Sequence, residues 1–229
     1  MAIRRAAQVI TVSETSKREI VNWMPYASGK TAVTPLACPD WIVRQDRAMA
    51  TEKIHVDFGI KGPFLLTVGT RWPRKNMKLA LAAIEGLPPE FPHKLVVTGK
   101  AGWGEERLGK RGIAVGYVDN DTLSRLYSAA VLYLAPSFHE GFGIPLLEAF
   151  RCGCPVLCSS GGALPEVADG AAEIEGSWKP DEWSRTIAGL LNDPSKLLSL
   201  KDRGIEREKL YSWAETARKT LEVYREVAK

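Results

Sequence analysis

Residues 131–157 read VLYLAPSFHEGFGIPLLEAFRCGCPVL, and this stretch decides the expected fold. It predicts a fully apolar strand over 131–136, a loop with two glycines, a helix, and a second apolar strand over 154–159. Pro145 near the first turn and Gly153 past the last turn mark the two ends of that helix. Strands without alternation of apolar and polar residues, each followed by a helix, indicate a parallel sheet covered on both faces.

The same alternation of strand and helix extends through most of the chain. Further strands are predicted at 64–69, 94–100, 112–117 and 171–175. Helices are predicted at 76–87, 104–111, 121–130, 181–193, 194–211 and 212–229. The expected fold class is therefore α/β, a Rossmann-like parallel sheet with helices on both faces, which binds its ligands at the carboxyl ends of the strands.

Residues 1–63 follow a different pattern. Residues 7–13 predict a short strand, and Ser13 is placed to cap a helix over 14–24. One strand and one helix cannot form a domain alone, so we expect this part to be the last fragment of another domain. Residues 44–63 are polar and predict irregular structure with at most a short helix.

Composition limits the classes of function. The chain has 229 residues, 45% of them apolar and 25% charged, with a net charge of +4. This mild basic excess is spread along the chain, which disfavours nucleic acid as a partner. No apolar run has the length of a membrane helix, and the amino terminus does not resemble a signal peptide. The four cysteines do not have the spacing of a disulfide framework or a zinc site, so we expect small buried thiols in a reducing cytosol.

Two glutamates flank the glycine-containing loop of the opening stretch. A glycine loop followed by a helix start forms a cradle for phosphate, because free N–H groups and the positive end of the helix dipole point at the ligand. Glu140 and Glu148 would then accept hydrogen bonds from hydroxyls on either side of the phosphate, as a sugar nucleotide requires. The alternative is structural: Glu140 caps backbone N–H groups, and Glu148 pairs with Arg151 or Lys75.

A second set of polar residues follows the strand at 64–69. Arg71, Arg74 and Lys75 place three cations at the edge of the sheet where a diphosphate is expected; the alternative is a solvated basic loop. Gly116 and Val118 end a further strand, where main-chain groups can meet a nucleobase. The Asp-Asn-Asp run at 119–121 opens a helix, so we interpret it as a cap and predict no metal site.

These motifs, in this order, resemble the carboxyl-terminal half of retaining glycosyltransferases of the family-4 type, which have the GT-B architecture. The resemblance rests on VGTRWPRKN, LVVTGK, VGYVDNDTLSRLYSAA, LAPSFHEGFGIPLLEAFRCGCPVL, GGALPEV and YSWAETARKTLEVY, which cover most of residues 64–229. It implies four segments. Residues 1–24 would be the last strand and helix of an otherwise absent amino-terminal acceptor domain, and residues 25–63 a connector. Residues 64–193 would be the nucleotide-sugar-binding domain, and residues 194–229 the carboxyl-terminal helices.

The resemblance also implies roles for single residues. Glu140 and Lys75 would be catalytic: Glu140 holds sugar hydroxyls and Lys75 contacts the donor diphosphate, assisted by Arg71 or Arg74. Gly69 and Thr70 would also contact the donor, with Thr70 at a place where the family often has an arginine. The remaining donor contacts would come from Gly116 and Val118 at the base, Glu148 at the ribose, and the N–H groups of Phe142, Gly143 and Ile144 at sugar or phosphate.

The function implied is transfer of a hexose, with mannose favoured, from a GDP- or UDP-sugar to a glycan or lipid-linked acceptor, with retained anomeric configuration and no cofactor. Expected partners are the nucleotide sugar, the acceptor, and an amino-terminal acceptor domain on another chain or a second copy of this one. The expected location is cytoplasmic, with contact to the inner face of the membrane left open. The alternatives are a nucleotide-sugar binding module that is inactive alone, and a scaffold with a degenerate site.

The predicted last helix carries Trp213, Ala217, Leu221 and Tyr224 at helical spacing. These residues either pack on their own domain or, as the resemblance implies, belong to a helix that crosses back to the other domain. In the second case an apolar surface stays open and favours self-association.

Overall fold

The structure is a computed structural model that describes residues 2–100 and 108–228. Within these residues a six-stranded, fully parallel sheet has the order β5-β4-β3-β6-β7-β8. The strands are β3 (Phe64–Val68), β4 (Lys94–Thr98), β5 (Gly112–Gly116), β6 (Leu132–Ala135), β7 (Val156–Ser159) and β8 (Glu173–Glu175). The predicted fold class is confirmed. The short helix predicted over 104–111 falls mostly outside the described residues.

Both faces of the sheet are buried, as the unbroken apolar strands predicted. Successive residues of a strand enter opposite cores because strand side chains alternate between faces. One core contains Leu66, Val96 and Tyr133, and the other contains Leu65, Leu95 and Leu132.

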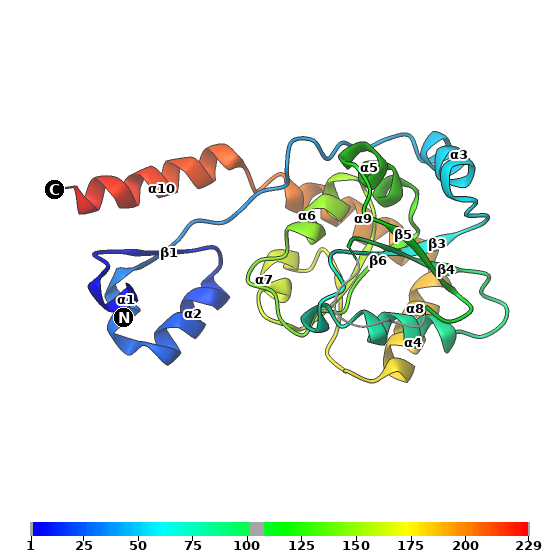
Figure 1. Cartoon of the computed structure of the whole chain (residues 1–229), viewed down its shortest axis with the longest axis horizontal. Helices are drawn as coiled ribbons and strands as arrows, with labels where there is room; N and C mark the ends of the chain where they lie inside the picture. Colours follow the sequence, from blue (N-terminus) through cyan, green and yellow to red (C-terminus); the bar gives the residue numbers. More distant parts are fainter. Residues whose placement is uncertain (1, 101–107, 229) are drawn as a thin grey trace.

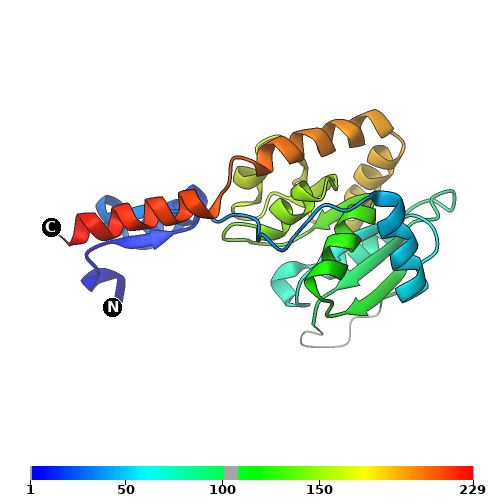
Figure 2. The ribbon, with the colours of Figure 1, turned by 90° about the horizontal axis from the view of Figure 1, so that it is seen from above.

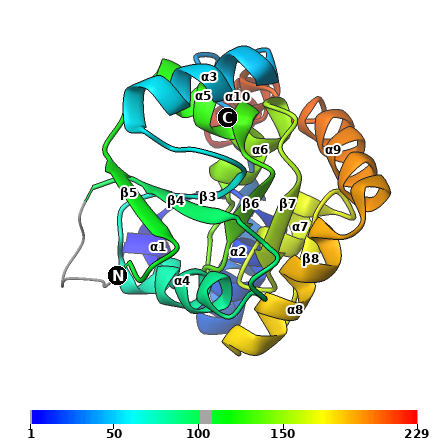
Figure 3. The ribbon, with the colours of Figure 1, turned by 90° about the vertical axis from the view of Figure 1, so that its right-hand side faces the viewer.

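Helices cover these two cores (Figure 3). On one face lie α3 (Arg47–Phe58), α5 (Asn120–Ala129) and α6 (Ile144–Arg151). On the other face lie α4 (Met77–Glu85) and α8 (Pro180–Leu191), while α9 (Pro194–Glu208) packs on both α6 and α8. A short helix, α7 (Leu164–Ala168), follows β7.

Helix α3 corrects the expectation of irregular structure with at most a short helix over 44–63. It runs for 12 residues, starts at the Asp46 cap and ends at Gly59, which has a left-handed conformation. Ala50 and Ile54, one turn apart, are buried against the core next to α5. The polar composition hid the helix because only this narrow stripe of it is buried.

A small amino-terminal lobe lies at one side of the main body (Figure 1). It contains α1 (Ala2–Arg5), the parallel strands β1 (Val9–Thr11) and β2 (Thr31–Val33), α2 (Glu14–Trp23) and the 3-10 helix η1 (Pro25–Lys30). The predicted Ser13 cap is confirmed, since its side chain accepts a hydrogen bond from the N–H of Ser16.

The last helix, α10 (Trp213–Val227), leaves the main body and lies along this lobe (Figures 1 and 2). It is fixed near its start, where Trp213 Nε1 donates to the Cys38 carbonyl and Thr216 Oγ1 donates to the Pro35 carbonyl. The helix therefore crosses back towards the lobe (Figures 1 and 2). Its Leu221 and Tyr224 are exposed, which leaves apolar surface open. Self-association through this surface stays a prediction.

Two further features bear on the expectations. The four cysteines are free and buried, and burial raises the pKa of Cys152 and Cys158 to about 12, which makes them unreactive thiols. In residues 2–100 and 108–228, no helix combines the length and the apolar character needed to cross a membrane.

Two glycines inside helices provide a test of the packing. Gly204 of α9 lies against Phe150 of α6, and a Cβ there would sit 2.6 Å from a ring carbon. Gly189 of α8 is exposed, with nothing within 4 Å of its would-be Cβ. We expect Gly204→Ala to lower the free energy of unfolding by about 1–3 kcal/mol, and Gly189→Ala to raise it by about 0.5–1 kcal/mol. Urea unfolding measures both, and two changes of the same sign would contradict the packing described.

Candidate functional site

The candidate site lies at the carboxyl ends of β3 and β6, on either side of the point where the strand order reverses. β3 leads through Gly69 into the 3-10 helix η2 (Pro73–Lys75), and β6 leads through the loop at 136–143 into α6. The two loops touch, because the N–H of Phe138 donates to the Arg74 carbonyl at 2.8 Å. The sheet topology therefore brings together two motifs that are more than 60 residues apart in the sequence.

Glu140 is the centre of the polar network in this site. Its Oε1 accepts from Lys75 Nζ at 2.6 Å and from Ser137 Oγ at 2.7 Å. Its Oε2 accepts from Arg74 Nη1 at 2.7 Å. The Glu140 side chain is 11% exposed and that of Lys75 is 14% exposed, whereas that of Arg74 is 54% exposed. The network holds one carboxylate and two cations, so its net charge is positive.

The surroundings keep Glu140 ionised. Burial raises the pKa of this carboxyl, but the charge of Lys75 and the hydrogen bonds from Lys75, Ser137 and Arg74 outweigh burial and hold the pKa below its usual value. Glu140 thus binds cations and a hydroxyl, and the alternative in which it caps backbone N–H groups is not observed among the described contacts.

Glu148 has a different environment, one turn into α6. Its Oε2 accepts from the hydroxyl of Tyr127, a fully buried residue of α5, at 2.9 Å. Burial raises the pKa of Glu148, although the Tyr127 hydroxyl and the charge of Lys75 act in the opposite direction. The predicted alternative of a pair with Arg151 is wrong, because Arg151 binds Glu208 of α9 through Nε and Nη2, at 3.0 and 2.6 Å.

The start of α6 has the geometry expected of an anion cradle. Gly143, at its N-cap, has a φ of 108°, and a Cβ there would lie 2.9 Å from Leu164. Among the described contacts, the N–H groups of Phe142, Gly143 and Ile144 have no acceptor. Free N–H groups at the positive end of a helix attract anions.

The two-glycine turn before α7 holds the Glu140 main chain. The N–H of Ala163 donates to the Glu140 carbonyl at 2.8 Å, and a Cβ on Gly162 would come within 2.8 Å of the Glu140 nitrogen. Ser159, at the end of β7, donates to the Ser137 carbonyl at 2.5 Å. No role was predicted for Ser137 or Ser159 from the sequence. The glycine pair in GGALPEV was the available signal, because adjacent glycines allow another main chain, here that of Glu140, to pass close to the turn.

A pocket of about 280 Å³ adjoins this site at the ends of β3, β4 and β5. Of the predicted residues, Gly69, Thr70 and Val118 line it. Gly116 lies next to it, and its carbonyl accepts hydrogen bonds from the N–H of Gly99 and from Thr98 Oγ1. The pocket wall also contains Lys100 and Tyr117, which were not predicted from the sequence. The Lys100 ammonium lies 5.7 Å from the centre of the Tyr117 ring.

Two remaining predictions concern Arg71 and the Asp-Asn-Asp run. Arg71 donates its main-chain N–H to the Lys100 carbonyl at 3.2 Å, which places it on the rim of that pocket rather than in the Glu140 network. Asp119 accepts from the N–H of Thr122 at 2.7 Å and caps α5, as predicted. Asp121 forms an ion pair with Arg125 on the same helix.

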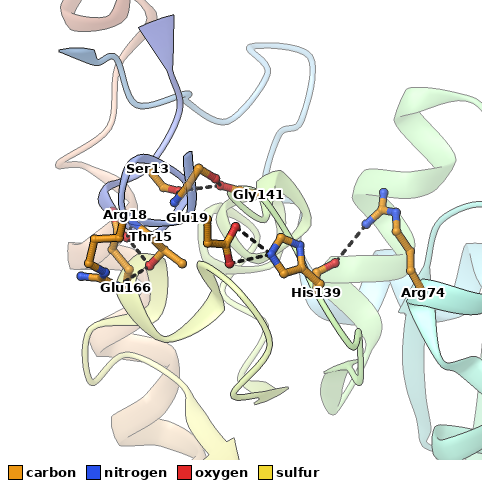
Figure 4. Close-up of polar contacts among 9 residues, drawn as sticks. Ser13, Thr15, Arg18, Glu19, Arg74, His139, Gly141 and Glu166 are labelled. Carbon is orange, nitrogen blue, oxygen red and sulfur yellow. Dashed lines mark hydrogen bonds and ion pairs between the residues drawn. The ribbon is translucent and has the colours of Figure 1, made fainter. Parts of the chain in front are cut away.

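Helix α2 of the amino-terminal lobe contacts the loop that carries Glu140 (Figure 4). The hydroxyls of Ser13 and Ser16 both donate to the Gly141 carbonyl, at 2.7 and 3.0 Å. His139 Nε2 lies 2.9 Å from Glu19 Oε1, so His139 bridges the two lobes.

Comparison with known proteins identifies the family. The model of the family described as "Glycosyl transferases group 1" matches residues 50–207, more than half of the chain. The chain belongs to this family. It is 34% identical over 232 residues to O-antigen chain mannosyltransferase B of Escherichia coli; the match covers 96% of this chain and 61% of that protein. The chain thus spans less than two thirds of the length of this relative.

Solved structures show the same fold. Sucrose-phosphate synthase from Thermosynechococcus elongatus superposes with a TM-score of 0.82 at 24% identity, over 98% of this chain and 59% of that one. HepE from Anabaena, in complex with UDP and glucose, superposes with a TM-score of 0.82 at 19% identity, over 100% of this chain and 64% of that one. At these identities the likeness concerns the fold.

The two buried glutamates should respond differently to replacement by glutamine. Glu140→Gln leaves Lys75 and Arg74 without their carboxylate, and we expect the free energy of unfolding at pH 7 to fall by about 2 kcal/mol. Glu148→Gln keeps an acceptor for Tyr127 and removes a buried charge, so the free energy of unfolding should stay the same or rise by up to about 1 kcal/mol. Urea unfolding of the two variants and the wild type measures these changes.

The pH dependence provides the control. The pKa of Glu140 is lower in the folded state than in the unfolded state. Its ionised form therefore stabilises the fold at pH values above the unfolded-state pKa. This stabilisation is lost as the pH falls through the folded-state pKa. The deficit of Glu140→Gln should therefore shrink between pH 7 and about pH 3. The raised pKa of Glu148 acts in the opposite sense and disfavours folding at neutral pH. A Glu140→Gln deficit that is equal at both pH values would contradict the ion-pair account.

Proposed function

We propose that this chain carries the donor site of a retaining glycosyltransferase, which transfers a hexose from a nucleoside-diphosphate sugar to a glycan or lipid-linked acceptor. The observation that supports this most directly is the Glu140 network. Lys75 and Arg74 meet a buried carboxylate in the loop that leads into α6, and the first N–H groups of α6 have no acceptor among the described contacts. Cations, amide donors and a hydroxyl acceptor in one place suit a diphosphate joined to a sugar.

In this proposal the diphosphate binds to Lys75, Arg74 and the start of α6. The excess positive charge of the network and the helix dipole both attract it. Negative charge accumulates on the departing diphosphate during transfer, so fixed cations and N–H groups stabilise the transition state more than the bound donor.

The carboxylates then bind hydroxyls. A diphosphate competes with Glu140 for Lys75 and Arg74, which allows Glu140 to accept hydrogen bonds from the sugar. Glu148 would hold the ribose in the orientation set by Tyr127, and the neighbouring pocket of about 280 Å³ would take the base. HepE, which shares the fold, binds UDP.

Mannose is the favoured sugar because curated relatives are named as mannosyltransferases. These include the O-antigen enzyme and the serotype-specific mannosyltransferase WbdA of Escherichia coli, which is 27% identical over 227 residues. We place the acceptor in a pocket of about 600 Å³ between α2 and the Glu140 loop, lined in part by Glu19, Trp23 and His139. A lipid-linked acceptor would bring the chain to the inner face of the membrane.

Donor binding can be tested on the chain as it is. Calorimetric titration with GDP- and UDP-sugars should show saturable binding of at least one of them, which Lys75→Gln weakens at least tenfold because a charged hydrogen bond to phosphate is lost. The exposed Lys78→Gln, three residues away on α4, is the matched control and should bind like the wild type. Absence of binding to every nucleotide sugar would overturn the proposed function.

Transfer is tested separately by product formation. With an acceptor, Glu140→Ala should cost about 2–4 kcal/mol of transition-state stabilisation, measured as a fall in kcat/KM. Unchanged turnover would refute the role of Glu140. Donor binding without turnover by the wild type would support a binding module that needs a separate acceptor domain.

A further inference from the structure

Helix α2 holds one particular peptide group of the donor loop. The Gly141 carbonyl accepts a hydrogen bond from Ser13 Oγ at 2.7 Å (Figure 4). It accepts a second one from Ser16 Oγ at 3.0 Å. The two donors belong to the amino-terminal lobe, more than 120 residues away in sequence. Two hydroxyls on one carbonyl fix the orientation of that peptide plane more firmly than a single bond would.

The other end of this peptide group is the N–H of Phe142. In a trans peptide the C=O and the N–H point in opposite directions. The hydroxyls that hold the Gly141 carbonyl therefore aim the Phe142 N–H away from α2. This N–H is one of the three at the α6 start that have no acceptor among the described contacts. Hydrogen bonds at the carbonyl also polarise the peptide and make its N–H a stronger donor.

Helix α2 is itself held by the main body. Glu166 of α7 accepts from the N–H groups of Glu14 and Thr15, both at 2.8 Å, and from the Thr15 hydroxyl at 2.8 Å. Burial raises the pKa of Glu166, but these hydrogen bonds outweigh burial and lower it, so the carboxylate stays charged at the positive end of α2. Glu166 thereby sets where Ser13 and Ser16 lie.

We propose that Ser13 and Ser16 are positioning residues of the donor site: they orient the Gly141–Phe142 peptide so that its N–H meets the sugar or β-phosphate of the donor. This inference rests on the proposed function and deepens it. It couples two equilibria: the docking of the amino-terminal lobe on the main body, and the binding of the donor. Each must then favour the other to the same extent.

Ser16→Ala is the variant that separates this role from others. The Ser16 hydroxyl donates to Gly141, whereas Ser13 also caps α2. Ser16→Thr keeps the hydroxyl and serves as the rescue. Ser195→Ala removes an exposed hydroxyl at the start of α9, which donates to the N-cap residue Asp193, and serves as the remote control.

The readout is a ratio of affinities. Calorimetry on the 229-residue chain compares the nucleoside-diphosphate sugar that the wild type binds with the monophosphate of the same base, which lacks the sugar and the β-phosphate. We expect Ser16→Ala to weaken the diphosphate sugar three- to tenfold and to change the monophosphate less than twofold. Ser16→Thr and Ser195→Ala should match the wild type in both, with unchanged Tm.

The outcomes distinguish this inference from the proposed function. If the wild type binds a nucleotide sugar and Ser16→Ala binds it equally well, the positioning role is overturned and the donor site stands. Equal losses for both ligands, without rescue by threonine, would show a merely structural effect and also overturn it. If the wild type binds no nucleotide sugar, the proposed function fails and this inference fails with it.

Discussion

A buried carboxylate must be balanced by charge or hydrogen bonds, and Glu140 meets this requirement through Lys75, Arg74 and Ser137. Lys75 reaches it because β3 and β6 are neighbours whose carboxyl ends open at the same edge of the sheet. The glycine turn at 161–162 packs against the Glu140 main chain from the other side. Three loops from three strands are therefore arranged around one charged group. A site built on strand ends in this way is held by the rigid part of the molecule.

The sequence contained enough to predict the sheet and the pairing of the two central motifs. Uninterrupted apolar runs such as 64–69 and 131–136 indicate buried parallel strands, and parallel topology then requires Lys75 and Glu140 to share an edge. Helix α3 was not predictable in the same way, because most of its residues are on the surface and only Ala50 and Ile54 are buried. Tyr127 as the partner of Glu148 depends on how α5 and α6 pack. No local pattern reports such a contact between helices.

The contacts between the lobes could not be predicted from the sequence either. Glu166 caps α2 from more than 150 residues away, and Ser13 and Ser16 reach the loop after β6. Each residue has an ordinary local explanation, since Ser13 is a helix cap and Glu166 lies in the first turn of α7. Their second role appears only when the lobes are seen together. The amino-terminal lobe is thus joined to the main body at the loop that carries Glu140. A change in the relative position of the lobes would therefore alter the conformation of this loop.

The measurement that tests the central claim most directly is a crystal structure of the chain with the nucleoside diphosphate that it binds. The account predicts that the β-phosphate lies at the start of α6, within hydrogen-bond distance of Lys75 Nζ and of at least one of the N–H groups of residues 142–144. It predicts that the base lies in the pocket formed by Gly69, Thr70 and Val118. A diphosphate bound away from Lys75 and the start of α6 would contradict the account.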